Sequence, residues 1–321
     1  MSLHVLSPGP LTTVQDLGRT GWRHLGVARA GALDPGAAML ANRLVGNRID
    51  AAVLELTLSG PTLRLERPVR VALHGAPVDA RFEPIDGPRC AVPGGRPLTL
   101  PAGVLQLKAL RDGARAWLAV AGGLDVPRVL GSRSTDLRGG FGGLDGRALR
   151  QGDTLALLAA PSLDVARPEI ARWWVDPPTR RAGSPIIRYV PSSHPCAPVL
   201  ARTLWQASPD SNRQGLRLDG ACVPGAAPDA NAGEQVSAAV APGTIQLPPD
   251  GQPIVLLADA QTVGGYPRLG HVIAVDLPVL AQIRPGEALR FAPCDPTTAG
   301  QLACESRARA ARLELMLASR A

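Results

Sequence analysis

Residues 101–107 read Pro-Ala-Gly-Val-Leu-Gln-Leu, and residues 241–247 read Ala-Pro-Gly-Thr-Ile-Gln-Leu, so one pattern occurs twice in the chain. Gly103 matches Gly243, and further pairs follow in the same order. These pairs are Asp112-Gly113 with Asp250-Gly251, Gly122-Gly123 with Gly264-Gly265, and Pro127-Arg128 with Pro267-Arg268. An ordered series of matches predicts a duplicated module.

Alternating stretches indicate that this module is built of strands. Apolar and polar residues alternate over residues 54–58, 62–66 and 69–73, with Gly or Pro near each end. A period of two residues predicts half-buried strands. The chain also has 35 Gly and 32 Pro, so turns recur at short intervals, as in compact barrels or sandwiches. We therefore expect a mostly β chain.

Three helices are expected to interrupt the strands. The first begins after Asp34, a residue that can cap free backbone N–H groups, has Pro35 in its first turn and ends at Gly46. The second is expected over residues 276–284, and the third over residues 298–319, close to the end of the sequence.

The length of 321 residues suggests about two domains. The repeat places them at residues 1–160 and 186–295. Prolines are frequent over residues 161–185, which we interpret as a linker. Residues 296–321 are expected to form a helical tail.

The composition nearly excludes lysine chemistry, because Lys108 is the only lysine among 34 basic residues. The chain therefore has no Gly-rich loop ending in Gly-Lys-Ser or Gly-Lys-Thr, and no Met-Lys-Met site for attaching biotin. If ATP or biotin takes part in the chemistry, we expect its usual binding machinery on another chain or in an unusual site.

Other functional classes are not expected from the composition. The net charge is +7, but the arginines are scattered and aromatic residues make up 3%, so we expect no nucleic-acid binding. The five cysteines lack metal or disulfide spacing, the five histidines are isolated, and we expect no metal site. With no signal peptide and no apolar run long enough for a membrane span, we expect a cytoplasmic protein.

Two polar motifs in the first copy could bind a substrate. Gln15, Asp16 and Arg19 follow a strand-like segment and could orient a small polar molecule; alternatively, Asp16 pairs with Arg19 and clamps a turn. Arg133, Ser134 and Thr135 lie in a Gly-rich loop over residues 131–143 and suit a carboxylate or phosphate. The alternative for this loop is a flexible, solvated segment.

A third motif lies in the second copy. Gln261, Thr262 and Tyr266 follow an apolar strand over residues 254–258, and nearby glycines allow close backbone approach. These three residues are also candidates for substrate binding. Residues 192–194, Ser-Ser-His, could suggest a nucleophile and base, but no strand-turn-helix elbow surrounds them and we do not favour that interpretation.

At these motifs the sequence resembles the allophanate hydrolase subunit 2 family, also called biotin-dependent carboxyltransferases, to which the C-type subunit of the prokaryotic 5-oxoprolinase belongs. The resemblance covers about residues 3–292. It rests on residues 9–19, 31–35, 119–127, 131–135, 243–251 and 261–267.

The resemblance implies two tandem cyclophilin-like β-barrel domains with a few short helices. It also implies a partner like allophanate hydrolase subunit 1, which is the B-type 5-oxoprolinase chain, together with an A-type chain and a small amide or lactam substrate. With these partners the expected activity is ATP-dependent cleavage of 5-oxo-L-proline to L-glutamate, with no turnover by this chain alone. The alternatives are a carboxyltransferase component of a biotin-dependent urea carboxylase and a regulatory binding subunit without turnover.

Two positions depart from the family pattern. Asn212 stands where relatives often carry Asp, and Ala238 stands where an acidic residue is common. These departures would fit an altered choice of substrate or a less active paralogue. The resemblance does not say which residues are catalytic.

Overall fold

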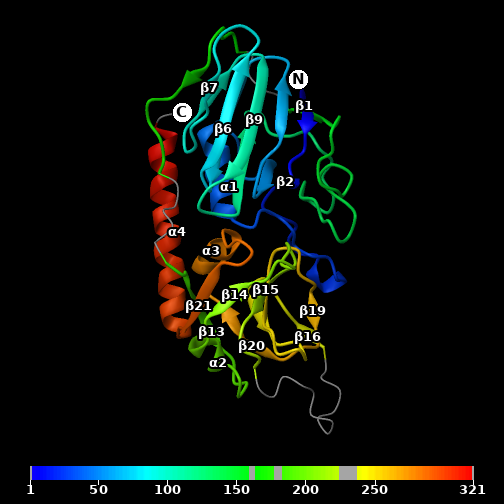
Figure 1. Cartoon of the computed structure of the whole chain (residues 1–321), viewed down its shortest axis with the longest axis vertical. Coiled ribbons are helices and arrows are strands. Elements are labelled where there is room, and N and C mark those ends of the chain that lie inside the picture. Colours follow the sequence, from blue (N-terminus) through cyan, green and yellow to red (C-terminus); the bar gives the residue numbers. More distant parts are fainter. Residues whose placement is uncertain (1, 159–162, 177–182, 224–236, 320–321) are drawn as a thin grey trace. The chain divides into compact units, whose positions relative to one another are not determined.

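The computed structural model describes residues 2–158, 163–176, 183–223 and 237–319 (Figure 1). They divide into two compact units: Met1–Arg19, Ala30–Arg180 and Glu314–Ala321 form the first, and Thr20–Arg29 and Arg181–Leu313 form the second. Within the expected linker, residues 161–162 and 177–182 lie outside the described residues.

In the described residues, the first unit contains two antiparallel six-stranded sheets. The first sheet has the order β11 (Thr154–Ala156), β1 (Ser2–Ser7), β4 (Thr62–Leu65), β9 (Gly103–Leu110), β6 (Val78–Pro84), β7 (Cys90–Ala91). The second has the order β12 (Glu169–Ile170), β8 (Leu98–Leu100), β5 (Val69–Gly75), β10 (Arg115–Val120), β3 (Val53–Thr57), β2 (Leu11–Gln15). Figure 1 shows β6 and β9 side by side, in the register that pairs Phe82 with Leu105.

The inner faces of both sheets build one hydrophobic core. Leu63 and Phe82 come from the first sheet, Leu54 and Leu118 from the second, and none of these four side chains is exposed to solvent. Alternation along each strand turns every second residue toward this core, as the period of two predicted.

The opposite face of the second sheet carries a buried polar row. Thr13, Glu55, Trp117 and His74 are cross-strand neighbours on β2, β3, β10 and β5. Glu55 Oε2 accepts hydrogen bonds from Trp117 Nε1 at 3.1 Å and from the Leu33 N–H at 2.8 Å. Both faces of β3 are buried, one in the hydrophobic core and one in this polar row. Apolar and polar residues therefore alternate over residues 54–58 although the strand is not exposed to solvent.

Helix α1 (Pro35–Leu44) contacts β5 and β10. Its start is fixed by the Asp34 side chain, which accepts the Ala37 N–H at 3.0 Å. Burial raises the pKa of the Asp34 carboxyl, although the N–H groups of Ala37 and Gly36 partly oppose this shift, and nearby Glu55 raises the pKa further. The predicted cap and helix are confirmed.

The second unit contains a closed barrel. Its strand order is β13 (Ile186–Pro191), β20 (Arg268–Val272), β17 (Thr244–Gln246), β18 (Ile254–Leu256), β15 (Gly215–Asp219), β14 (Trp205–Ala207), β21 (Ala288–Pro293). The β13–β21 pair is parallel and the other pairs are antiparallel. Tyr189 and Phe291 meet edge to face, with ring centroids 5.7 Å apart. A two-stranded ribbon, β16 (Ala238–Ala239) with β19 (Val263–Gly264), also belongs to this unit.

The remaining helices are mostly short. They are η1 (Arg23–Leu25), α2 (Val199–Arg202), η2 (Ala274–Asp276), α3 (Leu277–Ala281) and the longer α4 (Pro296–Ala318). Together η2 and α3 occupy the second predicted helix, and α4 occupies the third. None of the helices in the described ranges combines the length and the apolar content needed to cross a membrane.

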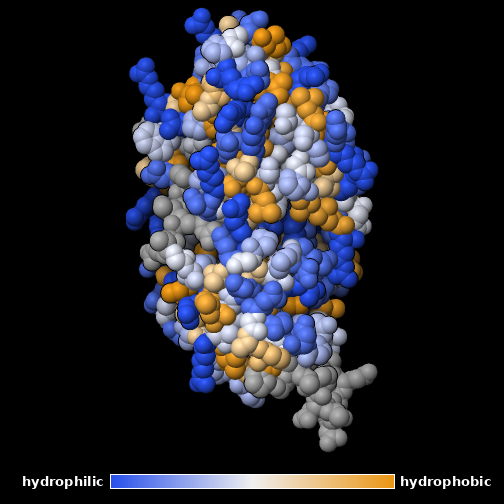
Figure 2. All heavy atoms as spheres, viewed as in Figure 1, coloured by the Kyte–Doolittle hydropathy of each residue, from blue (hydrophilic) through white to orange (hydrophobic). Residues whose placement is uncertain are grey.

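The prediction of a mostly β chain with few helices is confirmed. Segment Thr20–Arg29 was expected in the N-terminal domain but clusters with the second unit. Arg23 Nη2 donates a hydrogen bond to the Val240 carbonyl oxygen of that unit. On the face shown in Figure 2, hydrophobic residues occur in small groups between hydrophilic ones.

The buried His74 predicts a loss of stability in acid. Neither ring nitrogen has a hydrogen-bond partner among the described residues, and burial lowers its pKa from 6.5 to about 4. The unfolded chain therefore takes up a proton below pH 6.5 that the folded chain accepts only near pH 4. Stability present above pH 6.5 is lost as the pH falls toward 4, by about 3 kcal/mol.

Urea unfolding of the wild type and of His74→Gln over this pH range measures the effect. We expect the variant to lose the part of the slope that His74 contributes, while His271, whose pKa burial also lowers, keeps its own part. His24→Gln removes an exposed histidine and should keep the wild-type slope. An equally steep slope in His74→Gln would show that other groups cause the acid sensitivity.

Candidate functional site

The first candidate site forms where β2 ends, at Asp16. Its carboxylate accepts four hydrogen bonds: Oδ1 from the Gly18 N–H at 2.8 Å and from the Ser132 and Ser134 hydroxyls at 2.6 Å, and Oδ2 from the Arg133 N–H at 2.6 Å. Charge-assisted bonds of this length are strong. The carboxylate therefore holds the loop over residues 131–143 against the end of β2.

The loop continues this attachment along the edge of β2. Thr135 donates to the Val14 carbonyl with both its N–H, at 2.9 Å, and its hydroxyl, at 3.0 Å. Ser134 Oγ also accepts the Asp16 N–H at 2.9 Å. Ser132, Ser134, Thr135 and Asp136 are all buried, so the alternative of a solvated loop does not hold for these four residues, whereas Arg133 between them is half-buried.

Arg19 lies inside this cluster. It is 1% exposed, its guanidinium carbon lies 4.7 Å from the centre of the Phe141 ring, and its Nη2 donates to the Ser134 carbonyl. Gly142 has a φ of +72°, and a Cβ there would lie 2.2 Å from the Ser134 carbonyl oxygen. A glycine at this position lets the loop close over the guanidinium.

Gln15 is also buried. Its Nε2 donates to Thr13 Oγ1 at 3.0 Å and to the Thr135 carbonyl at 3.2 Å, whereas its Oε1 has no partner among the described residues. The structure thus brings together two motifs that were separate candidates in the sequence: Gln15, Asp16 and Arg19, and Arg133, Ser134 and Thr135. Substrate binding by them stays a prediction, since their hydrogen bonds also hold the fold.

The second-unit candidates are spread around the β16–β19 ribbon. Gln261 Nε2 donates to Gln246 Oε1 at 3.3 Å, Thr262 is buried, and Tyr266 is 47% exposed. The other end of the Gln246 amide, Nε2, would lie 2.4 Å from a Cβ on Gly264. A side chain at position 264 would therefore displace the end of the Gln246 side chain from its present place.

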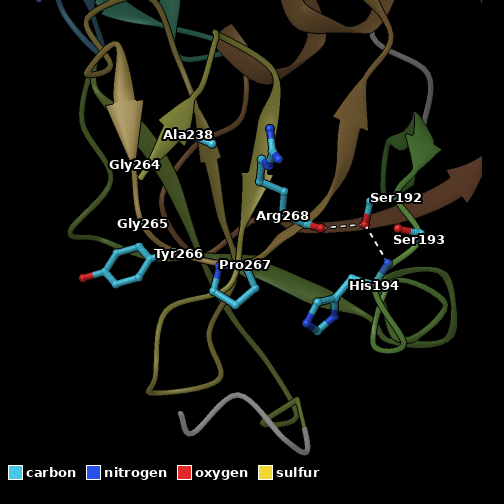
Figure 3. Close-up of a pocket in the computed structure, with 9 residues that line it drawn as sticks. All are labelled: Ser192, Ser193, His194, Ala238, Gly264, Gly265, Tyr266, Pro267 and Arg268. Carbon is cyan, nitrogen blue, oxygen red and sulfur yellow. Dashed lines mark hydrogen bonds between the residues drawn. The ribbon is translucent and has the colours of Figure 1, made fainter. Parts of the chain in front are cut away.

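Tyr266 lines a pocket of about 270 Å³ in the second unit (Figure 3). Arg268, Ala238, Ser193 and His194 also line it. In Figure 3 the Arg268 side chain extends toward Ala238, whereas the Tyr266 ring lies on the other side of Pro267 from His194. Sequence reasoning missed Arg268 as a site residue: it was visible as part of the repeated Pro-Arg pair, but nothing local showed that it faces a pocket.

The Ser192 hydroxyl does not form a nucleophile–base pair with His194. It donates to the Arg268 carbonyl at 2.5 Å and accepts the His194 N–H at 3.2 Å, while His194 Nδ1 accepts the Cys196 N–H. The described residues also contain no group of three or more His, Cys, Asp or Glu side chains that could hold a metal ion.

The two departures from the family pattern lie in different surroundings. Asn212 is exposed and its Oδ1 accepts the Gln214 N–H at 2.8 Å, which stabilises a turn. Ala238 lines the pocket beside Arg268 and brings no charge to it.

Comparison with known proteins gives a consistent set of relatives. A family model for the carboxyltransferase domain, subdomain A and B, matches residues 25–293. The chain is 41% identical to the C subunit of 5-oxoprolinase from Escherichia coli K12, over 91% of each chain. It is 31% identical to urea amidolyase of Lachancea kluyveri, over 94% of this chain and 17% of that protein. The crystal structure of Kluyveromyces lactis urea carboxylase matches 96% of this chain and 29% of its own, with 29% identity and a TM-score of 0.82.

The Asp16 cluster predicts a large effect of Asp16→Asn on stability. The amide keeps the shape of the carboxylate but loses its charge and turns a donor toward at least one N–H or hydroxyl. We expect the denaturant midpoint to fall by the equivalent of about 3 kcal/mol. Asp125→Asn, at an exposed position of the same unit, should change it little. A fully stable Asp16→Asn variant would show that this carboxylate does not hold the loop.

Proposed function

Because the chain belongs to the family of carboxyltransferase domains, subdomain A and B, we propose that it is the C-type subunit of a multi-component 5-oxoprolinase. In this proposal it works with A-type and B-type chains, and the assembly uses ATP to cleave 5-oxo-L-proline to L-glutamate. The ring amide of the substrate takes up water as it opens.

One observation carries the proposal: the similarity to the C subunit of the E. coli 5-oxoprolinase extends over 91% of both chains. The match to urea amidolyase spans nearly all of this chain but 17% of that protein. The match to the E. coli subunit therefore covers most of both sequences, whereas the match to urea amidolyase covers a small part of a larger protein.

ATP would be bound by a partner in this proposal. Phosphate-cradling loops combine backbone N–H groups with a lysine, and the sole lysine, Lys108, is exposed on strand β9. The residues of this chain do not fit such a loop. Its own contribution would be to position the substrate.

Tyr266 in the second unit and Arg133 in the first are separate candidates for that role, one in each unit. Tyr266 is exposed at a pocket, and Arg133 is half-buried on the loop that Asp16 holds. We propose that the buried members of the two clusters, including Gln15 and Thr262, act by supporting these segments.

The urea carboxylase structure favours a second candidate function. Its TM-score of 0.82 covers 96% of this chain, so a carboxyltransferase role with biotin carried by another domain has structural support. A regulatory subunit without turnover would form the same complexes and show neither activity.

The decisive measurement is glutamate formation from 5-oxoproline and ATP by this chain co-purified with its A-type and B-type partners. We expect activity that avidin does not inhibit and that falls to background when this chain is omitted. Avidin-sensitive carboxylation of urea-like amides, without glutamate formation, would instead establish the second candidate. A stable complex without either activity would contradict both.

A further inference from the structure

Two adjoining hollows in the second unit share one wall. The pocket beside Tyr266 measures about 270 Å³, and a neighbouring hollow measures about 530 Å³. Both are lined by Ser192, Ser193 and His194, which follow β13. Together they have the size of a small-molecule site.

The smaller hollow carries an uncompensated positive charge. Arg268 is exposed there, and its Nη1 makes one long hydrogen bond, 3.5 Å, to the Ala239 carbonyl. Among the described residues, no Asp or Glu lines either hollow and no carboxylate lies within ion-pair distance of Arg268. Figure 3 shows the Arg268 side chain on the side of Ala238 and away from His194. An anion is the complementary ligand.

The wall shared by the two hollows carries two further polar groups, Ser193 and His194, whose side chains lie apart from the Arg268 guanidinium in Figure 3. His194 Nδ1 accepts the Cys196 N–H at 3.2 Å, so the ring proton is carried on Nε2. The Ser193 hydroxyl lines the hollow beside it. Because Gly264 and Gly265 have no side chains, a ligand can approach the backbone there.

The larger hollow is mainly apolar. Its lining includes Pro191, Pro195, Pro198 and Pro293, with Ala201 and one charged residue, the exposed Arg202, beside them. Such rigid, apolar walls accommodate a compact ring or short hydrocarbon.

We propose that these hollows bind a small carboxylate with a compact ring: the carboxylate pairs with Arg268, and the ring lies over the proline-lined wall. Arg268 then determines specificity by separating acids from neutral amides of the same shape. That the acid is a lactam carboxylate such as 5-oxoproline rests on the proposed function, whereas the carboxylate preference rests on the pocket alone.

Calorimetric titration of the full chain tests the preference with three probes. 5-Oxoproline and cyclopentanecarboxylate carry the carboxylate, and 2-pyrrolidinone carries only the lactam. We expect both acids to bind roughly ten-fold or more tightly than 2-pyrrolidinone, as the loss of one charge-assisted bond implies. Equal binding of the neutral lactam, or no binding of either acid, would overturn the proposal.

Variants then assign the effect to Arg268. Arg268→Gln should weaken acid binding by roughly ten-fold, and Ala238→Glu should do the same by pairing with the guanidinium. Arg217→Gln removes an exposed arginine of β15 outside the pocket lining and should bind as the wild type does. Unchanged affinity in both pocket variants, or equal loss in Arg217→Gln, would overturn the assignment. Thermal unfolding confirms that each variant is folded.

The failure of this inference is distinguishable from failure of the proposed function. Acid binding through Arg268, with no glutamate from the complete assembly, would leave the pocket standing and refute the function. Glutamate formation with an unchanged KM in Arg268→Gln would support the proposed function and refute the role of Arg268 in binding the acid.

Discussion

Four hydrogen bonds converge on the Asp16 carboxylate, two from serine hydroxyls and two from backbone N–H groups. They hold a segment more than a hundred residues away in the chain against the end of β2. The attached loop then covers the β2 edge through Thr135 and encloses Arg19. The first unit depends on this charge because an unpaired buried carboxylate would be costly, and so would the serine and backbone donors left without it.

The local parts of the fold could be predicted from sequence because their causes are local. Asp34 caps α1 through the N–H three residues later, and strands over residues 54–58 and 69–73 follow from alternation. The partners of Asp16 could not be predicted in this way, since Ser132 and Ser134 become its neighbours only after folding. The motif suggested an Asp16–Arg19 clamp as one alternative, whereas the Asp16 carboxylate bonds to the distant loop. Glu55 and His74 were missed for a related reason, because alternation alone does not show that the second face of a sheet is covered.

The two candidate sites differ in how their charges are satisfied. In the first unit, the Asp16 carboxylate is bonded by serine hydroxyls and backbone N–H groups, and the Arg19 guanidinium is buried against the Ser134 carbonyl and the Phe141 ring, so both charges hold the fold together. In the second unit, Arg268 lies at a hollow whose described lining is uncharged apart from that arginine and a histidine. A charge that has no ion-pair partner among the described residues can select a ligand, whereas a saturated network resists the exchange of any one member.

The edge strands of the sheets limit how another polypeptide could pair with this chain. The outermost strands β7, β11 and β12 are two or three residues long, and β2 is engaged by the N–H groups of Thr135 and Leu149. The second unit closes its main sheet upon itself. These described margins offer few consecutive free backbone groups, which disfavours strand addition and edge-to-edge aggregation. Contact with another polypeptide at these margins would therefore depend on side-chain surfaces, which discriminate among sequences, and not on main-chain pairing, which does not.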